Sequence, residues 1–181
     1  IISTPETRAA IQRILRNLAF FRRLAQQHDW MKGLSEMAQA SMAEAARSKI
    51  FLPGQEVIRE GDPGDSMYFV KSGLLKVTKQ IPASASAVIG SLSEGDYFGE
   101  MALITGRPRT ATITAVTRTE VLSMDRESFE RIVAVYPFLR QELEKVVSSR
   151  QQGLSASLEA NINRSENLSS KIRMIQDLLI F

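Results

Sequence analysis

The sequence predicts an α+β fold in which a small antiparallel barrel or roll lies between two helical flanks. Glycine and proline mark turns, and eight of the ten glycines and four of the six prolines fall between Pro53 and Pro108. Short runs of strand-forming residues separate these turns, whereas the flanks, 1–50 and 126–181, carry apolar residues at helical spacing. Many short strands at this spacing favour a small antiparallel architecture.

The composition narrows the class of protein. Of 181 residues, 44% are hydrophobic and 24% charged, which excludes a disordered tail or a collagen-like fibre. No apolar stretch approaches the roughly 20 residues needed to span a bilayer. The chain has no cysteine and one histidine, His28, which excludes a zinc ribbon, a cysteine nucleophile and a multi-histidine metal centre. We therefore expect no catalytic site and no metal site, and a protein that is not an enzyme.

The net charge of +3 is too small to indicate a nucleic-acid partner. Positive charge is concentrated near the start, where five arginines stand against one acid between Glu6 and Arg23. Two interpretations remain open, a solvated basic helix face and a docking surface for an acidic partner or anionic lipid.

The N-terminal segment, 1–49, is expected to form two helices. Thr4 supplies a capping hydroxyl, Pro5 suits the first helical position and Glu6 suits the first turn. The first helix has its apolar residues at Ile11, Ile14, Leu15, Leu18 and Phe21. The second helix is predicted from Trp30 to about Lys49.

The central segment, 50–125, is expected to form the strands. In 110–116 alanine and isoleucine alternate with threonine, as in a half-buried strand. The segment 82–87 is low in complexity and predicts a surface hairpin tip. The predicted strands are Glu56–Arg59, Met67–Lys71, Leu74–Lys79, Ala87–Leu92, Thr110–Val116 and Glu120–Met124.

The C-terminal flank predicts further helices. Asp125 can cap a helix that Pro137 ends, and a second helix reaches Arg150, so that 126–150 forms a pair. The second helix has an apolar face, Leu139, Leu143, Val146 and Val147. In the extension, 151–181, an apolar stripe from Leu154 to Leu179 predicts either a docking helix or a coiled-coil seam for self-association.

The segment 98–112 carries more special residues than packing requires. Gly99 is expected to open a short helix after a strand and Gly106 to close it, which leaves free N–H groups that attract an anion. Arg109 could fold back over the same place and supply a forked cation. Glu100 would be repelled by an anion unless it accepts a hydrogen bond from a ligand hydroxyl. Together they indicate a sugar phosphate with a free hydroxyl, or else an internal Glu100–Arg109 salt bridge.

This segment closely resembles the phosphate-binding cassette of cyclic nucleotide-binding domains. The residues that carry the resemblance are Phe98-Gly99-Glu100-Met101-Ala102, then Pro108-Arg109-Thr110-Ala111-Thr112. Upstream, Phe51-Leu52-Pro53-Gly54, Glu60-Gly61-Asp62, Gly64-Asp65 and 68–73 are similar to the strand and turn signatures of the family. The resemblance covers about residues 45–150 and implies a jelly-roll-like β-roll with an N-terminal helical bundle and C-terminal helices.

The resemblance also implies roles for individual residues. Arg109 would pair with the cyclic phosphate, and Glu100 would accept the ribose 2′-hydroxyl. Val77 would pack against the base, and Arg150, late on the last helix, would cap it. The apolar face of that helix would then cover the occupied pocket. Backbone amides would assist the phosphate in the cassette, around Gly99, Met101, Ala102, Thr110 and Ala111.

We therefore expect a sensor that binds cAMP or cGMP without any other cofactor and passes a helix movement to an attached or docked effector. The resemblance implies the cytoplasm or the cytosolic face of a membrane protein. DNA binding is not expected, because only 31 residues follow Arg150 and they show a single amphipathic pattern. The alternative is a scaffold or oligomerisation module with the same fold, paired through 154–179.

Overall fold

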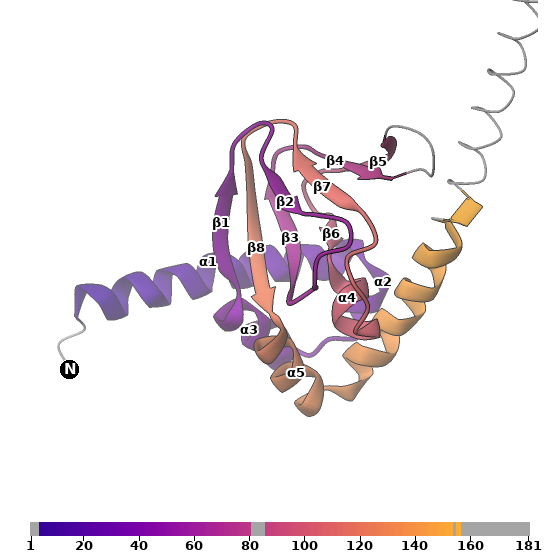
Figure 1. Ribbon diagram of the computed structural model, residues 1–181. Coiled ribbons are helices and arrows are strands. Elements are labelled where there is room, and N and C mark those ends of the chain that lie inside the picture. Colours follow the sequence, from indigo (N-terminus) through magenta and orange to yellow (C-terminus); the bar gives the residue numbers. More distant parts are fainter. Residues whose placement is uncertain (1–3, 81–85, 154, 157–181) are drawn as a thin grey trace, which may run out of the picture.

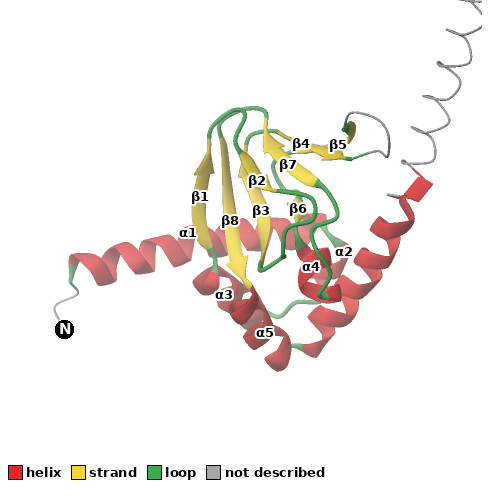
Figure 2. Cartoon of the chain, in the orientation of Figure 1, coloured by secondary structure: helices red, strands yellow, loops and turns green. Residues whose placement is uncertain are grey.

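The computed structural model describes residues 4–80, 86–153 and 155–156. It shows two four-stranded antiparallel sheets with helices at both ends of the chain (Figure 1, Figure 2). The strands are β1 (Arg47–Phe51), β2 (Glu56–Ile58), β3 (Ser66–Ser72), β4 (Leu75–Lys79), β5 (Ala87–Leu92), β6 (Tyr97–Phe98), β7 (Thr112–Ala115) and β8 (Thr119–Asp125). One sheet has the order β1-β8-β3-β6 and the other β2-β7-β4-β5. The predicted α+β class is confirmed, and the roll is open rather than closed into one barrel.

The first helix begins where the sequence predicts. α1 (Pro5–Gln27) is capped by Thr4, whose hydroxyl accepts a hydrogen bond from the amide of Thr7. The prediction of one second helix from Trp30 to about Lys49 is wrong. The structure has α2 (Asp29–Lys32) and α3 (Glu36–Ala45), because Ser35 caps a new helix by accepting from the amide of Ala38.

The last residues of that predicted helix belong to β1. Arg47 donates to the carbonyl of Glu44, at the end of α3. From there β1 pairs with β8, with Lys49 opposite Val121. A partner strand some seventy residues away thus takes this segment out of the helix.

The central strands agree well with the sequence. β5 has the predicted bounds, and most other strand ends differ by one or two residues. β7 is shorter than predicted because Thr110 and Ala111 belong to the cassette. Part of the predicted hairpin tip, residues 82–85, lies outside the described residues.

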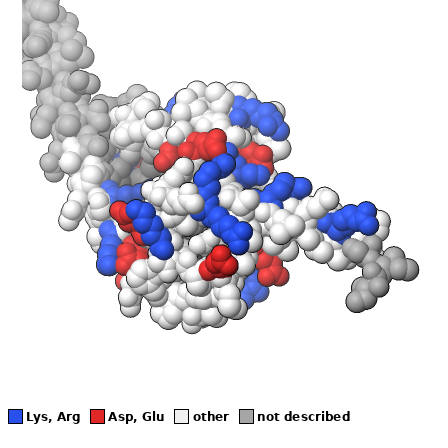
Figure 3. Space-filling model, turned by 180° about the vertical axis from the view of Figure 1, so that it is seen from behind, with Lys and Arg blue, Asp and Glu red and all other residues white. Residues whose placement is uncertain are grey.

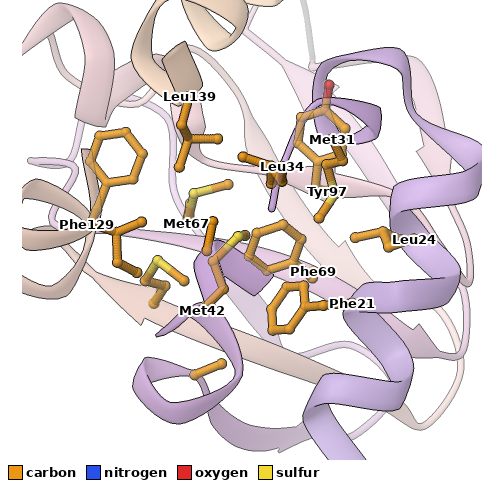
Figure 4. Close-up of a cluster of buried hydrophobic side chains, with 14 of the residues drawn as sticks. Phe21, Leu24, Met31, Leu34, Met42, Met67, Phe69, Tyr97, Phe129 and Leu139 are labelled. Atoms are coloured by element: carbon orange, nitrogen blue, oxygen red, sulfur yellow. The ribbon is translucent and has the colours of Figure 1, made fainter. Parts of the chain in front are cut away.

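β3 is buried from Ser66 to Val70 because it lies between two apolar clusters. Met67 and Phe69 belong to a large cluster shared with the helices, part of which Figure 4 shows. Tyr68 and Val70 belong to a smaller cluster with residues of β4, β7 and β8. The alternation of side chains along a strand explains how one strand serves both clusters.

At the other end α5 (Arg126–Val135) is capped as predicted by Asp125, which accepts from the amide of Ser128. After Tyr136 a further helix runs over 137–153. Leu139 and Leu143 of this helix are buried in the large cluster, to which Met31 and Leu34 also belong. Figure 4 shows Leu139 among the side chains of this cluster. The expectation that the ligand pocket covers this face is therefore wrong, since Leu139 and Leu143 pack in a cluster with residues of α1–α3, β3 and α5. The Leu154–Leu179 stripe lies outside the described residues.

The arginine-rich part of α1 is used partly within the molecule. Arg13 donates to the carbonyls of Glu44 and Ala46, and Arg23 pairs with Glu94 at 3.0 Å. The first half of α1 projects from the body and carries basic side chains (Figure 3). A docking role for this surface stays a prediction. Among the described residues, no helix is long and apolar enough to cross a membrane.

Candidate ligand-binding site

The predicted short helix of the cassette is present. β6 leads into Gly99, which precedes α4 (Glu100–Thr105), and Gly106 follows it. Gly99 has φ 85°, and a Cβ there would lie 2.8 Å from Nη1 of Arg109 and 2.9 Å from the carbonyl oxygen of Ser66. Glycine is required at this position both for its backbone conformation and for the close approach of Arg109.

Arg109 is the buried cation of the site. Only 5% of its surface is exposed, and it donates to the Gly99 carbonyl at 2.9 Å and to the Ser66 hydroxyl at 3.2 Å. Asp65 lies 3.7 Å away but is largely exposed. Burial lowers the pKa of Arg109, and the nearby Tyr68 and Asp65 oppose part of this effect. The guanidinium is charged because arginine does not lose its proton in proteins. Its two hydrogen bonds use two of its five donors, which leaves capacity for an anion.

Gly64 makes room for this arrangement. A Cβ on Gly64 would lie 2.1 Å from the Cβ of Ala102 and 3.3 Å from the guanidinium carbon of Arg109. The carbonyl of Gly64 also accepts from Arg126, which donates in addition to the carbonyls of Ala102 and Leu103. Arg126 thus ties α4 to the start of α5.

Glu100 is the buried anion of the site, with 1% of its surface exposed. Its Oε1 accepts from Nη1 of Arg150 at 2.8 Å, while its Oε2 has no hydrogen-bond partner among the described residues. Burial raises the pKa of Glu100, and the Arg150 charge lowers it. The partner of Glu100 is therefore Arg150, and the structure does not contain the Glu100–Arg109 salt bridge that the sequence left open.

Arg150 reaches the site from the helix over 137–153. Besides Glu100 it donates to the Tyr97 carbonyl at 3.0 Å, and its guanidinium lies 4.4 Å from the centre of the Tyr97 ring. Burial raises the pKa of the Tyr97 hydroxyl to about 12, so the ring stays neutral beneath the cation. The sequence indicated Arg150 as a cap over a base but did not indicate its contact with Glu100.

These residues line one cavity of about 400 Å³, within the range of small-ligand sites. The structure brings all nine sequence-predicted residues to it: Val77, Gly99, Glu100, Met101, Ala102, Arg109, Thr110, Ala111 and Arg150. Apolar side chains of β2, β5 and β7 that were not predicted as site residues also line the cavity, namely Ile58, Ile89, Leu92 and Ile113. The lining thus combines charged side chains of the cassette and the last helix with apolar side chains of the strands.

Two further residues at the site, Ser66 and Tyr97, were not predicted from the sequence. Ser66 follows Gly64-Asp65, one of the signatures that the sequence analysis noted, so its position at the site had a signal. Tyr97 had none beyond its place beside Phe98. No cluster of three or more metal-ligating side chains occurs in the described part of the chain.

The family model for the cyclic nucleotide-binding domain matches residues 48–136. The cAMP-dependent protein kinase regulatory subunit of Dictyostelium discoideum is 36% identical over 118 residues, which are 63% of this chain and 36% of that protein. The cGMP-dependent protein kinase, isozyme 1, of Drosophila melanogaster is 36% identical over 126 residues, 68% of this chain and 16% of that protein.

A solved structure of a related domain is similar to this chain. The regulatory domain of Toxoplasma gondii PKA, crystallised with cAMP, matches with a TM-score of 0.71 and 28% identity, over 79% of this chain and 52% of that one. The chain spans about a third or less of the length of the two curated relatives and about half of this structure.

Proposed function

The chain belongs, through residues 48–136, to the family of cyclic nucleotide-binding domains, and from this premise we propose that its cavity binds cAMP to regulate an effector. The observation that carries the proposal is the presence of two buried charged side chains, Arg109 and Glu100, in one cavity. Arg109 keeps donors for a phosphate, and Glu100 keeps one carboxylate oxygen, Oε2, for a hydroxyl. A cyclic nucleotide presents both groups on one rigid ring system.

The rest of the cavity supports the same ligand. The phosphate would lie at Arg109, close to the first amides of α4, which have no partner within the helix. The base would lie between the apolar wall around Val77 and the end of the helix that carries Arg150. Thr110 offers a hydroxyl to a guanine base, so cGMP is expected to bind as well, more weakly than cAMP.

We further propose that the domain acts by binding alone, without catalysis, and that the helix over 137–153 transmits the presence of ligand. Its Arg150 contacts Glu100, the residue assigned to the ribose. Relatives named as regulatory subunits of a protein kinase support an attached or docked kinase as the effector, and a cytosolic location. Self-association through 154–179 stays a prediction outside the described residues.

Thermal or chemical unfolding with added nucleotide tests the binding proposal. Ligand at a hundred times its dissociation constant should add about 2.7 kcal/mol to the free energy of unfolding. Adenosine, which lacks the phosphate, should add far less at the same concentration, and Arg109→Ala should abolish the response to cAMP. A chain whose stability is unchanged by cAMP and by cGMP would instead be the scaffold that the sequence analysis kept as its alternative.

A further inference from the structure

Lys79, at the end of β4, holds the main chain of the cassette from outside the cavity. Its Nζ donates to the carbonyl oxygen of Thr110 at 2.7 Å and to Oε1 of Glu60 at 2.7 Å. The other carboxylate oxygen of Glu60 accepts from the amide of Gln80 at 2.8 Å. The side chains of Lys79 and Glu60 are only 18% and 22% exposed, so this pair is better shielded from water than an ordinary surface salt bridge.

The turn over residues 60–62, which begins at Glu60, holds Arg109 by its backbone. The amide of Arg109 donates to the carbonyl of Asp62 at 2.8 Å, and its carbonyl accepts from the amide of Gly61 at 2.9 Å. The amide of Glu60 donates to the Thr112 hydroxyl at 2.9 Å. The turn around Glu60 and the end of β4 therefore hydrogen-bond successive main-chain groups of the cassette, from the amide of Arg109 to the carbonyl of Thr110.

These contacts determine where two amides point. Each peptide unit is planar, so fixing a carbonyl also fixes the N–H of the following residue. Gly61 fixes the Arg109 carbonyl and with it the Thr110 amide, and Lys79 fixes the Thr110 carbonyl and with it the Ala111 amide. Thr110 and Ala111 both line the cavity beside Arg109.

We propose that Lys79, held by Glu60, is a positioning residue for phosphate binding: it orients the Arg109–Ala111 backbone and does not touch the ligand. This rests on the proposed function. The alternative role, a second cation that attracts the phosphate directly, makes an opposite prediction for Glu60. Removing the Glu60 carboxylate would strengthen a directly acting Lys79, but it would release a Lys79 whose role is to hold the Thr110 carbonyl.

Titration calorimetry with cAMP on four variants tests the proposal. Lys79→Met keeps the aliphatic stem and should weaken cAMP about tenfold, a loss typical of one hydrogen bond from a charged donor. Lys79→Arg can still donate to the carbonyl and should recover most of the affinity. Glu60→Ala should weaken cAMP severalfold. Lys76→Met, an exposed lysine on the same strand, is the matched control and should stay within about twofold of the wild type.

A second readout separates positioning from a general loss of stability. The ³¹P chemical shift of bound cAMP reports the hydrogen bonds of the phosphate, and at saturating ligand it does not depend on the fraction of folded protein. It should change in Lys79→Met and remain as in the wild type in Lys76→Met. An unchanged shift in Lys79→Met, affinity within twofold of the wild type, or tighter binding by Glu60→Ala would each overturn the positioning role. A wild-type chain that binds no cAMP would overturn the proposed function, and the role of Lys79 with it.

Discussion

Arg150 and Glu100, fifty positions apart, are joined by an ion pair of 2.8 Å at the cavity. The pair occupies one oxygen of the Glu100 carboxylate and leaves the other, Oε2, unpartnered in the described structure. It also brings the end of the last helix to the residue that is expected to meet the ribose. Ligand recognition and the position of this helix therefore depend on one carboxylate.

Arg109 should dominate affinity for cAMP. Removing one partner of a buried charge pair costs on the order of 3–5 kcal/mol, so Arg109→Ala should weaken cAMP by two to three orders of magnitude. Arg109→Lys keeps the charge but loses the forked geometry, so its affinity for cAMP should lie between those of the wild type and Arg109→Ala. Titration calorimetry measures both, and a loss of less than tenfold for Arg109→Ala would contradict the assigned role.

Glu100 should discriminate through the ribose hydroxyl. A site that hydrogen-bonds a ligand hydroxyl rejects the analogue without it, because its own polar group is then left buried and unpaired. We expect the native chain to bind 2′-deoxy-cAMP much more weakly than cAMP, and Glu100→Ala to lose most of this preference. Equal binding of the two ligands by the native chain would remove Glu100 from the ribose site.

The Arg150–Glu100 pair should be visible in the pH dependence of stability. Because burial raises the pKa of Glu100 above its ordinary 4.5, the unfolded chain ionises first as pH rises. The contribution of Glu100 to the free energy of unfolding is therefore largest at low pH and is lost as pH rises through its folded pKa. Arg150 lowers that pKa, so Arg150→Ala should raise it further and enlarge the loss.

Urea unfolding of the two proteins from about pH 4 to about pH 8 checks this prediction. Groups such as Glu120 and Asp125, whose pKa values are lowered, are common to both proteins and cancel in the comparison. Combining Arg150→Ala with Glu100→Gln should remove the added pH dependence. Parallel curves for wild type and Arg150→Ala would mean that the pair does not form in solution.

Thr110 should influence the choice of base. Its hydroxyl lies at the cavity, 3.7 Å from the sulfur of Met101, and can turn to accept from the amino group of a guanine. Thr110→Ala should leave cAMP affinity nearly unchanged and weaken cGMP severalfold, as expected for one neutral hydrogen bond of about 1 kcal/mol. Competition binding gives the ratio directly, and an unchanged cAMP to cGMP ratio would show that the hydroxyl is not read.

Ligand should order only the end of the last helix. Leu139 and Leu143 are buried in the large apolar cluster, so amides near them should resist exchange both with and without cAMP. Arg150 and Gly153 line the cavity, and protection should rise there when cAMP is added. Hydrogen exchange with and without cAMP distinguishes the two parts, and a rise spread evenly over 138–150 would favour a helix that moves as a whole.

Much of the site follows from local sequence. Gly99 and Gly106 have positive φ, and this local preference marks both ends of α4 without knowledge of the rest of the fold. Asp125 and Thr4 mark helix starts in the same way, because a cap bonds an amide only three residues ahead. The short helix between Gly99 and Gly106 therefore followed from local residues, whereas the cassette and the phosphate role of Arg109 were implied by the resemblance of 98–112 to cyclic nucleotide-binding domains.

Other features depend on pairing between distant segments, which no local pattern contains. The sequence predicts a helix over residues 47–49, but they form part of β1 because they pair with β8. Ser35 caps a separate helix, α3, before them. The apolar face of the last helix packs in a cluster with residues of α1–α3, β3 and α5, although its spacing alone fitted a ligand pocket equally well. Arg150 meets Glu100, and Lys79 meets Thr110, only once the sheets and helices have packed. Local residue preferences thus account for the turns, the helix caps and the ends of α4. Tertiary packing selects which buried charges meet, because burial penalises every polar group left without a partner.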